Sequence, residues 1–161
     1  MMSMGAGKRR DRLIQDKRHD VYQEKEKLPE PTRCPRCGAV FMQGRWTWNT
    51  AEGKAHETVC PACRRISDNL PAGHIELKGE FFAAHRDEIM NLVHNVESQE
   101  KSLHPLERIM AVTEEKGGVA ITTTGVHLAR GIGDALSRAW KGERSLHYGE
   151  AETSVRILWS R

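Results

Sequence analysis

Two Cys-x-x-Cys pairs, separated by 22 residues, constrain this chain more than any other feature of its sequence. Two residues between cysteines turn both sulfurs toward one point, with backbone amides directed at the thiolates. Two such turns supply four soft donors, the set that zinc prefers in closed, structural sites. The pattern therefore predicts a structural Zn²⁺ site formed by the only four cysteines of the chain, Cys34, Cys37, Cys60 and Cys63.

Other chemistries also use four cysteines. An iron–sulfur cluster accepts the same residues, and the spacing alone does not exclude it. A thioredoxin-type redox pair requires a βαβ context and one activated thiol, whereas the two pairs here match each other. Disulfides are disfavoured because nothing marks the chain for secretion. Structural zinc is the favoured interpretation, and an iron–sulfur cluster and redox chemistry remain as alternatives.

The net charge of +3 is distributed unevenly along the chain. Residues 1–68 carry five more basic than acidic side chains, and residues 69–161 carry two more acidic than basic. A basic N-terminal region is typical of a protein that binds a polyanion. No apolar run approaches the roughly 18 residues of a membrane span, and no apolar core follows the basic residues 1–12. We therefore expect a cytoplasmic protein without a membrane partner.

Composition and periodicity divide the chain into three parts. Residues 1–33 are predicted to form a basic, flexible arm, with a solvated tail as the plainer interpretation. Residues 34–68 are predicted to form a zinc ribbon, with a β-hairpin around Gln43-Gly44 and a strand returning to the second cysteine pair. Residues 69–161 are predicted to form an α+β domain.

The third part shows alternating strand and helix patterns. A strand at 75–77, a helix over about 80–100, strands at 109–113 and 119–123, a helix capped by Thr124, and strands at 145–148 and 155–159 are expected. The order β-α-β-β-α-β-β predicts a ferredoxin-like split-βαβ domain with an extra C-terminal strand. Two helices would cover one face of an antiparallel sheet.

Basic and aromatic side chains suggest contact with RNA. Arginine binds phosphate through two parallel hydrogen bonds, and an exposed tryptophan stacks on an unpaired base. Packing of the tryptophans in a small core is the alternative. The candidate nucleic-acid-binding residues are Lys8, Arg9, Arg10, Arg36, Arg45, Trp46, Trp48, Arg64, Arg65 and Arg130.

Known catalytic motifs are absent from the sequence. There is no phosphate-binding Gly-x-x-x-x-Gly-Lys-Ser/Thr, no Gly-x-Ser-x-Gly and no His-Glu-x-x-His, and the eight histidines are scattered. We therefore expect a protein that is not an enzyme and has no small-molecule substrate. A protein–protein adaptor in transcription or stress response is the alternative to RNA binding, and a thiol or metal enzyme is a third reading.

Five blocks of sequence form a recognisable set: CPRCG at 34–38, GRW at 44–46, CPACRRI at 60–66, ITTT at 121–124 and HLARGIG at 127–133. Together they resemble a family of small bacterial zinc-ribbon proteins. That family is similar to the N-terminal part of the archaeal and eukaryotic adaptor, of the nonsense-mediated-decay type, that exports large ribosomal subunits. Its members are labelled as affecting ribosome stability and mRNA decay.

The resemblance covers roughly residues 30–161. It implies a partner in rRNA or the large ribosomal subunit, with a ribosomal protein as a further contact, and a role in ribosome stability, assembly or dormancy. The eukaryotic adaptor carries more than one cysteine cluster and nuclear-traffic signals. This chain has a single four-cysteine set and no evident signal of that kind, so export is not expected.

Overall fold

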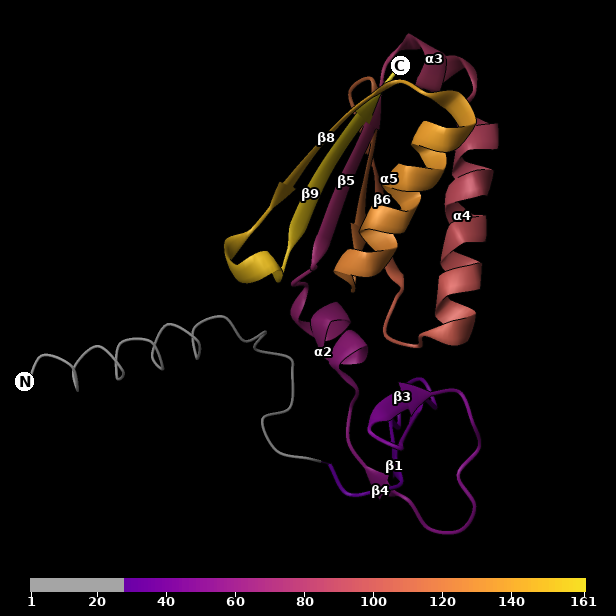
Figure 1. Ribbon diagram of the computed structural model, residues 1–161, viewed down its shortest axis with the longest axis vertical. Helices are drawn as coiled ribbons and strands as arrows, with labels where there is room; N and C mark the ends of the chain where they lie inside the picture. The colour runs from indigo at the N-terminus through magenta and orange to yellow at the C-terminus, as the bar shows by residue number, and fades with distance from the viewer. Residues whose placement is uncertain (1–27) are drawn as a thin grey trace, which may run out of the picture.

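A computed structural model describes residues 28–161 of the chain. The arm residues Lys8, Arg9 and Arg10 lie outside the described residues. Figure 1 shows a small β module at one end and a helix-covered sheet at the other, joined through the short helix α2 (Pro61–Asp68). The C-terminus lies at the far end of the larger unit from the small module. No described helix is long and apolar enough to cross a membrane.

The small module is a four-stranded sheet with the order β3-β2-β1-β4. The expected hairpin is present, and both of its turn residues, Gln43 and Gly44, have left-handed φ angles of 54° and 77°, as a two-residue turn between twisted strands requires. The sheet also includes the segment just before the first cysteine, which pairs with both β2 and β4. The strands are β1 (Thr32–Arg33), β2 (Val40–Met42), β3 (Arg45–Thr47) and β4 (His56–Glu57).

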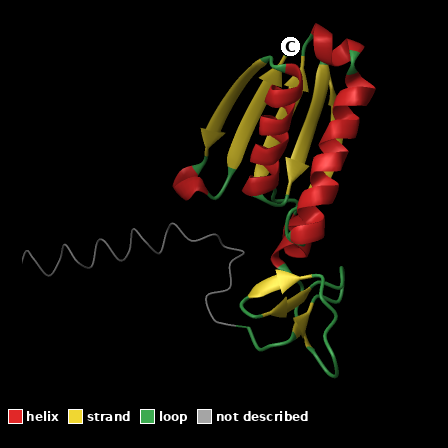
Figure 2. Cartoon of the chain, turned by 45° about the vertical axis from the view of Figure 1, so that its right-hand side comes forward, coloured by secondary structure: helices red, strands yellow, loops and turns green. Residues whose placement is uncertain are grey.

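The larger unit is a five-stranded sheet with the order β6-β7-β5-β9-β8. Helices α4 and α5 lie side by side on one face of it (Figure 2). Its elements are β5 (Gly73–Lys78), α3 (Glu80–Ala84), α4 (Arg86–Leu103), β6 (Ile109–Glu115), β7 (Gly118–Thr123), α5 (Val126–Trp140), β8 (Glu143–Tyr148), the 3₁₀ turn η1 (Glu150–Glu152) and β9 (Val155–Ser160). The α+β class predicted from the sequence is confirmed.

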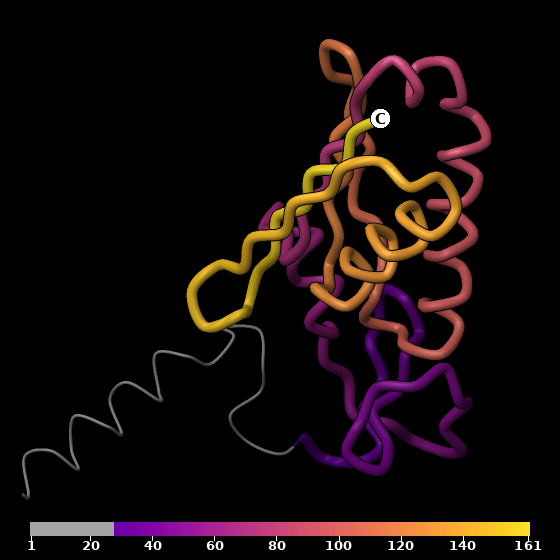
Figure 3. Tube along the Cα trace, turned by 45° about the horizontal axis from the view of Figure 1, so that its top comes forward, coloured from indigo at the N-terminus to yellow at the C-terminus, as the bar shows by residue number. Residues whose placement is uncertain are grey.

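The position of the last strand corrects the expected sheet. β9 pairs in parallel with β5 and antiparallel with β8, so it lies between them and the sheet is mixed. The expected additional strand is present, but the prediction of an antiparallel sheet was wrong at this pairing, and the ferredoxin-like split-βαβ arrangement is not confirmed. The reason is burial, because the large side chains of Val155, Ile157 and Trp159 are almost completely buried and favour an interior strand over an edge. The exposed β8 takes the edge, and Figure 3 shows this hairpin along one side of the unit.

Two local predictions also need correction. The helix expected over about 80–100 is divided into α3 and α4 at His85, whose φ of −121° is not helical. The amides of Phe81 and Phe82 donate to the carbonyl of Arg161, which anchors α3 across the end of the sheet. Thr124 does not cap α5, because Gly125 holds the cap position and makes no side-chain hydrogen bond. The Thr124 hydroxyl instead donates to the Leu106 carbonyl at 2.6 Å.

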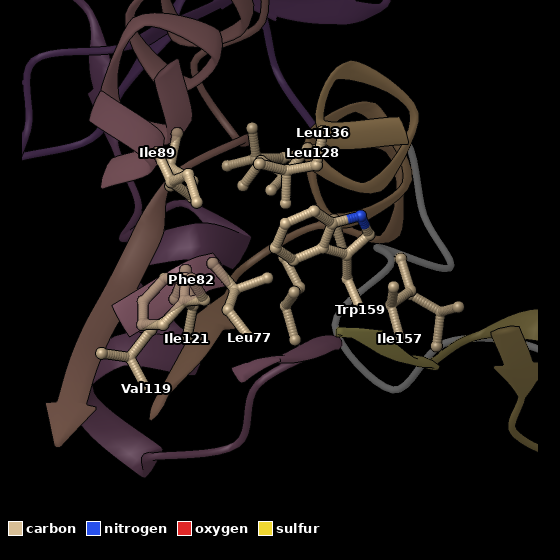
Figure 4. Packing of buried hydrophobic residues seen from close by; sticks show 14 residues of the cluster. Leu77, Phe82, Ile89, Val119, Ile121, Leu128, Leu136, Ile157 and Trp159 are labelled. Carbon is tan, nitrogen blue, oxygen red and sulfur yellow. The ribbon is translucent and has the colours of Figure 1, made fainter. Parts of the chain in front are cut away.

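The core of the larger unit lies between the sheet and its helices. Trp159 projects toward Leu128 and Leu136 of α5 (Figure 4), and its indole Nε1 donates to the Lys141 carbonyl at 2.7 Å. Leu77, Ile121 and other buried strand residues complete this core, which is separate from the small cluster around the cysteines. The larger unit therefore has its own apolar core, whereas the buried cluster of the small module consists mainly of cysteines.

Candidate metal centre

The four cysteine sulfurs lie together in the small module. All four are within 4.8 Å of one another, and Cys37 Sγ is 3.8 Å from Cys60 Sγ. Four sulfurs at about 2.3 Å from one tetrahedral ion would be about 3.8 Å apart, whereas a disulfide bond is about 2.05 Å long. All four are free thiols. The cluster therefore has the dimensions of a single-ion site, and the predicted grouping of the cysteines is confirmed.

The local backbone directs amides at these sulfurs. Cys34 and Cys37 lie in the turn between β1 and β2, whereas Cys60 caps α2 and Cys63 lies in its first turn. The amides of Ala39, Cys60 and Cys63 donate to the sulfurs of Cys37, Cys34 and Cys60, at 3.4, 3.3 and 3.4 Å respectively. Each Cys-x-x-Cys turn therefore stabilises negative charge on sulfur.

Arg108 completes the surroundings of the cluster. Its guanidinium donates to Cys37 Sγ at 3.0 Å, to Cys63 Sγ at 3.3 Å and to Cys60 Sγ at 3.6 Å, and the side chain is 7% exposed. Its Nε donates to the Pro105 carbonyl at 2.6 Å, and this bond fixes the orientation of the guanidinium group. This residue precedes β6 of the larger unit. It places one positive charge directly beside the thiolates.

Sequence reasoning missed Arg108. It lies 45 residues beyond the last cysteine, in a stretch with no recognisable motif. Two features could have drawn attention to it. It is a cation directly before a short apolar run at 109–112, and it follows the His104-Pro105 break that ends α4. Neither feature indicates which distant group the side chain contacts, so only the folded chain reveals its role.

Burial and hydrogen bonding act differently on the four thiols. Burial would raise the pKa of Cys34, but hydrogen bonds from the backbone at Cys60, Cys37 and Arg36 outweigh it and lower that pKa to about 6. Burial raises the pKa of Cys60 well above its usual range, and it also raises the pKa of Cys63, which Arg108 opposes. A buried cluster of this kind ionises fully only with a cation among its sulfurs.

The donor set decides what the cluster can hold. Four thiolates around a point suit Zn²⁺ or iron, the soft or borderline ions that accept sulfur ligands. A cluster of several irons with bridging sulfides would require a wider separation than 4.8 Å between the cysteine sulfurs. The geometry therefore favours one ion held by all four cysteines. Its coordination would be closed, because the four sulfurs fill a tetrahedral shell.

The predicted nucleic-acid-binding arginines differ in accessibility. Arg36, Arg45 and Arg130 are exposed, and Arg36 donates to the Ser67 hydroxyl. Arg64 is half-buried. Arg65 is 8% exposed, and its Nη1 donates to the Leu70 carbonyl at 2.9 Å, just beyond the end of α2. Arg65 therefore has a structural role within the chain, whereas Arg36 and Arg45 present their side chains to solvent.

The two ribbon tryptophans lie between the ribbon and the larger unit. Trp46 is half-buried and packs edge-on against Phe41, with ring centres 5.6 Å apart. Trp48 is 37% exposed, and its Nε1 donates to the Lys101 carbonyl at 2.6 Å, near the end of α4. The Arg108 guanidinium lies 5.8 Å from the centre of the Trp48 ring. Trp48 thus joins the two units, and Trp46 retains part of its surface for other contacts.

No protein-family model matches this chain, and no curated protein matches its sequence. The resemblance to the small bacterial zinc-ribbon proteins therefore stays a prediction. What is established is an α+β protein with a four-cysteine cluster whose geometry suits a metal ion.

Proposed function

We propose that this chain is a non-enzymatic zinc-ribbon protein that binds rRNA or the ribosome. The observation that carries the zinc-ribbon, non-enzymatic part of the proposal is the sulfur cluster, in which four cysteines surround one point and Arg108 donates to their sulfurs. A tetrathiolate shell leaves no position for a substrate or an activated water. The ion would then stabilise the ribbon, and the exposed surface of the ribbon would contact the rRNA or the ribosome.

The distribution of charge supports a polyanionic partner. Residues 28–161 carry 17 acidic and 17 basic side chains, so the whole net charge of +3 comes from residues 1–27. Zinc bound to four thiolates would add two negative charges to the ribbon. Attraction toward RNA therefore comes mainly from the basic cluster of Lys8, Arg9 and Arg10, while Arg36 and Arg45 supply local contacts with phosphate.

The family resemblance suggests the large ribosomal subunit as the partner. A role in ribosome stability, assembly or dormancy belongs to the same proposal. A protein–protein adaptor is the second candidate, and the electrical neutrality of residues 28–161 favours it. The two candidates differ in salt dependence, since counterion release makes contacts with several phosphates weaken steeply as salt rises.

Charge reversal at Lys8, Arg9 and Arg10, each to Glu, is expected to weaken binding to rRNA and ribosomes. Each lost phosphate contact should reduce the slope of log affinity against log salt by about 0.7–0.9. Sucrose-gradient sedimentation of lysate at low and high salt, followed by affinity measurements on purified rRNA, measures the effect. Reversal of Arg36 and Arg45 together tests the ribbon without disturbing the buried Arg65.

The matched control carries the same change of charge on the larger unit. Lys78, Lys116 and Arg138 are exposed residues of the larger unit, and their replacement by Glu should leave the salt slope nearly unchanged. Equal weakening by both sets would mean that only overall charge matters. Salt-tolerant capture of a protein, with no rRNA in the same fractions, would favour the adaptor and contradict RNA binding.

A further inference from the structure

A pocket of about 450 Å³ lies at the junction between the ribbon and the larger unit. Figures 1 and 2 both show β3 next to the C-terminal end of α4, where this junction falls. Sites for small organic groups occupy about 300–1,000 Å³, so the pocket has room for one nucleotide-sized group. It is lined by Arg45 and Trp46 of β3, by residues 103–107 and by His127 of α5.

The walls of this pocket are held by contacts within the chain. The Pro105 carbonyl accepts from Arg108 Nε, and the Leu106 carbonyl accepts from the Thr124 hydroxyl, each at 2.6 Å. Leu106 and Trp46 also pack against the cysteine cluster. The same interactions that surround the cluster therefore fix the shape of the pocket.

Glu107 provides a hydrogen-bond acceptor in the pocket wall. Its Oε1 accepts from the amide of Leu128 at 2.6 Å, in the first turn of α5. Among residues 28–161, no group donates a hydrogen bond to Oε2. Burial raises the pKa of this carboxyl group, consistent with its sheltered position. A Cβ at position 125 would lie 1.8 Å from Oε2, so a larger residue there would displace the carboxylate from this position. One carboxylate oxygen thus remains for a ligand.

The other lining groups define the chemistry of that ligand. The Trp46 indole offers a flat apolar surface, and the exposed Arg45 forms no ion pair within the described part of the chain. His104 and His127, with ring centres 6.2 Å apart, add two further aromatic edges. A ligand that combines a planar ring, an N–H group and an anionic group would match the Trp46 surface, the Glu107 acceptor and the Arg45 cation respectively. A basic peptide side chain would match Glu107 but would be repelled by Arg45.

We infer that this pocket binds one unpaired nucleotide of RNA, an inference that rests on the proposed function. The base stacks on Trp46 and donates a hydrogen bond from its exocyclic amino group to Glu107 Oε2, while Arg45 contacts the adjacent phosphate. Aromatic stacking and a base-edge hydrogen bond are the usual means by which proteins recognise unpaired RNA bases. The ribbon and the larger unit thus share one recognition site, which neither of them contains alone.

The test uses two labelled RNA hairpins that differ only in one bulged adenosine. Fluorescence anisotropy with the full-length, zinc-loaded protein should show about tenfold tighter binding of the bulged hairpin. Glu107→Gln keeps the Oε1 acceptor for Leu128 but places an amino group where Oε2 was, so the preference should fall to near unity. Trp46→Leu should also abolish the preference, whereas Trp46→Phe should retain most of it. Arg138→Gln, on the exposed face of α5, is the control.

The possible outcomes separate this inference from the proposed function. If the wild-type protein binds both hairpins equally, or if Glu107→Gln keeps the full preference, the pocket is not a nucleotide site, and RNA binding by the rest of the chain still stands. If neither hairpin binds at low salt, the proposed function fails together with the inference. Zinc content, measured for every variant, identifies any loss of affinity that reflects an unfolded ribbon.

Discussion

Removal of the metal by a chelator is expected to unfold the ribbon, residues 32–68, while the core of the larger unit stays folded. The ribbon sheet contains two strands of only two residues each, and its buried cluster consists mainly of the cysteines. Metal binding contributes about 10–16 kcal/mol in small zinc peptides, far more than so small a core provides. The core around Trp159 and Ile75 involves none of the four sulfurs.

Amide hydrogen exchange measures this outcome segment by segment. Amides of β2, β3 and α2 should exchange many-fold faster after chelation, and those of β5, β7 and β9 should keep their protection. A double replacement of Cys34 and Cys60 by serine should give the same pattern without a chelator. A ribbon that stays protected after its metal is stripped would show that the cluster does not stabilise it.

Replacement of Arg108 by methionine is expected to lower zinc affinity by about 10–100-fold, the usual effect of removing a group that supports metal ligands. The guanidinium donates to three sulfurs and is almost completely buried, so its loss leaves the negative charge of the tetrathiolate without its nearest partner. Competition with a chromophoric chelator measures the affinity. Arg108→Lys should lower the zinc affinity by an intermediate amount, because lysine keeps the positive charge but lacks the planar guanidinium group that donates to several sulfurs.

Arg138→Met is the matched control for this experiment, since Arg138 is exposed on α5 and distant in the chain from the cluster. Its zinc affinity should equal that of the wild-type protein. Arg108→Met should also loosen the ribbon from the larger unit, because the same side chain lies near Trp48 at the junction. Unchanged zinc affinity in Arg108→Met would mean that its contacts with the sulfurs do not support metal binding.

Local spacing allowed the cysteine cluster to be predicted well. Two residues between cysteines fix how a tight turn places its sulfurs, so the convergence of the four thiols follows from short-range geometry. Alternating apolar residues likewise predicted the central strands, including Ile75 and Leu77 of β5 and Val155, Ile157 and Trp159 of β9. These patterns depend on burial of one face and require no knowledge of neighbouring strands.

Features that depend on distant parts of the chain were not predictable in this way. Periodicity shows that β9 is buried but not that it lies parallel to β5. The two-residue strands β1 and β4 are too short to have a pattern, and α2 is a polar helix whose start is set by Cys60. The contact of Arg108 with the sulfurs arises only when the larger unit folds against the ribbon. The candidate site was therefore predictable in its ligands but not in its surroundings.

X-ray absorption at the zinc edge of the purified, full-length protein tests the central claim most directly. We expect one zinc ion per chain, surrounded by four sulfur atoms at about 2.3 Å with no oxygen or nitrogen ligand. A spectrum with light-atom ligands, a protein with much less than one ion per chain, or iron in place of zinc would contradict the closed zinc tetrathiolate proposed for this ribbon.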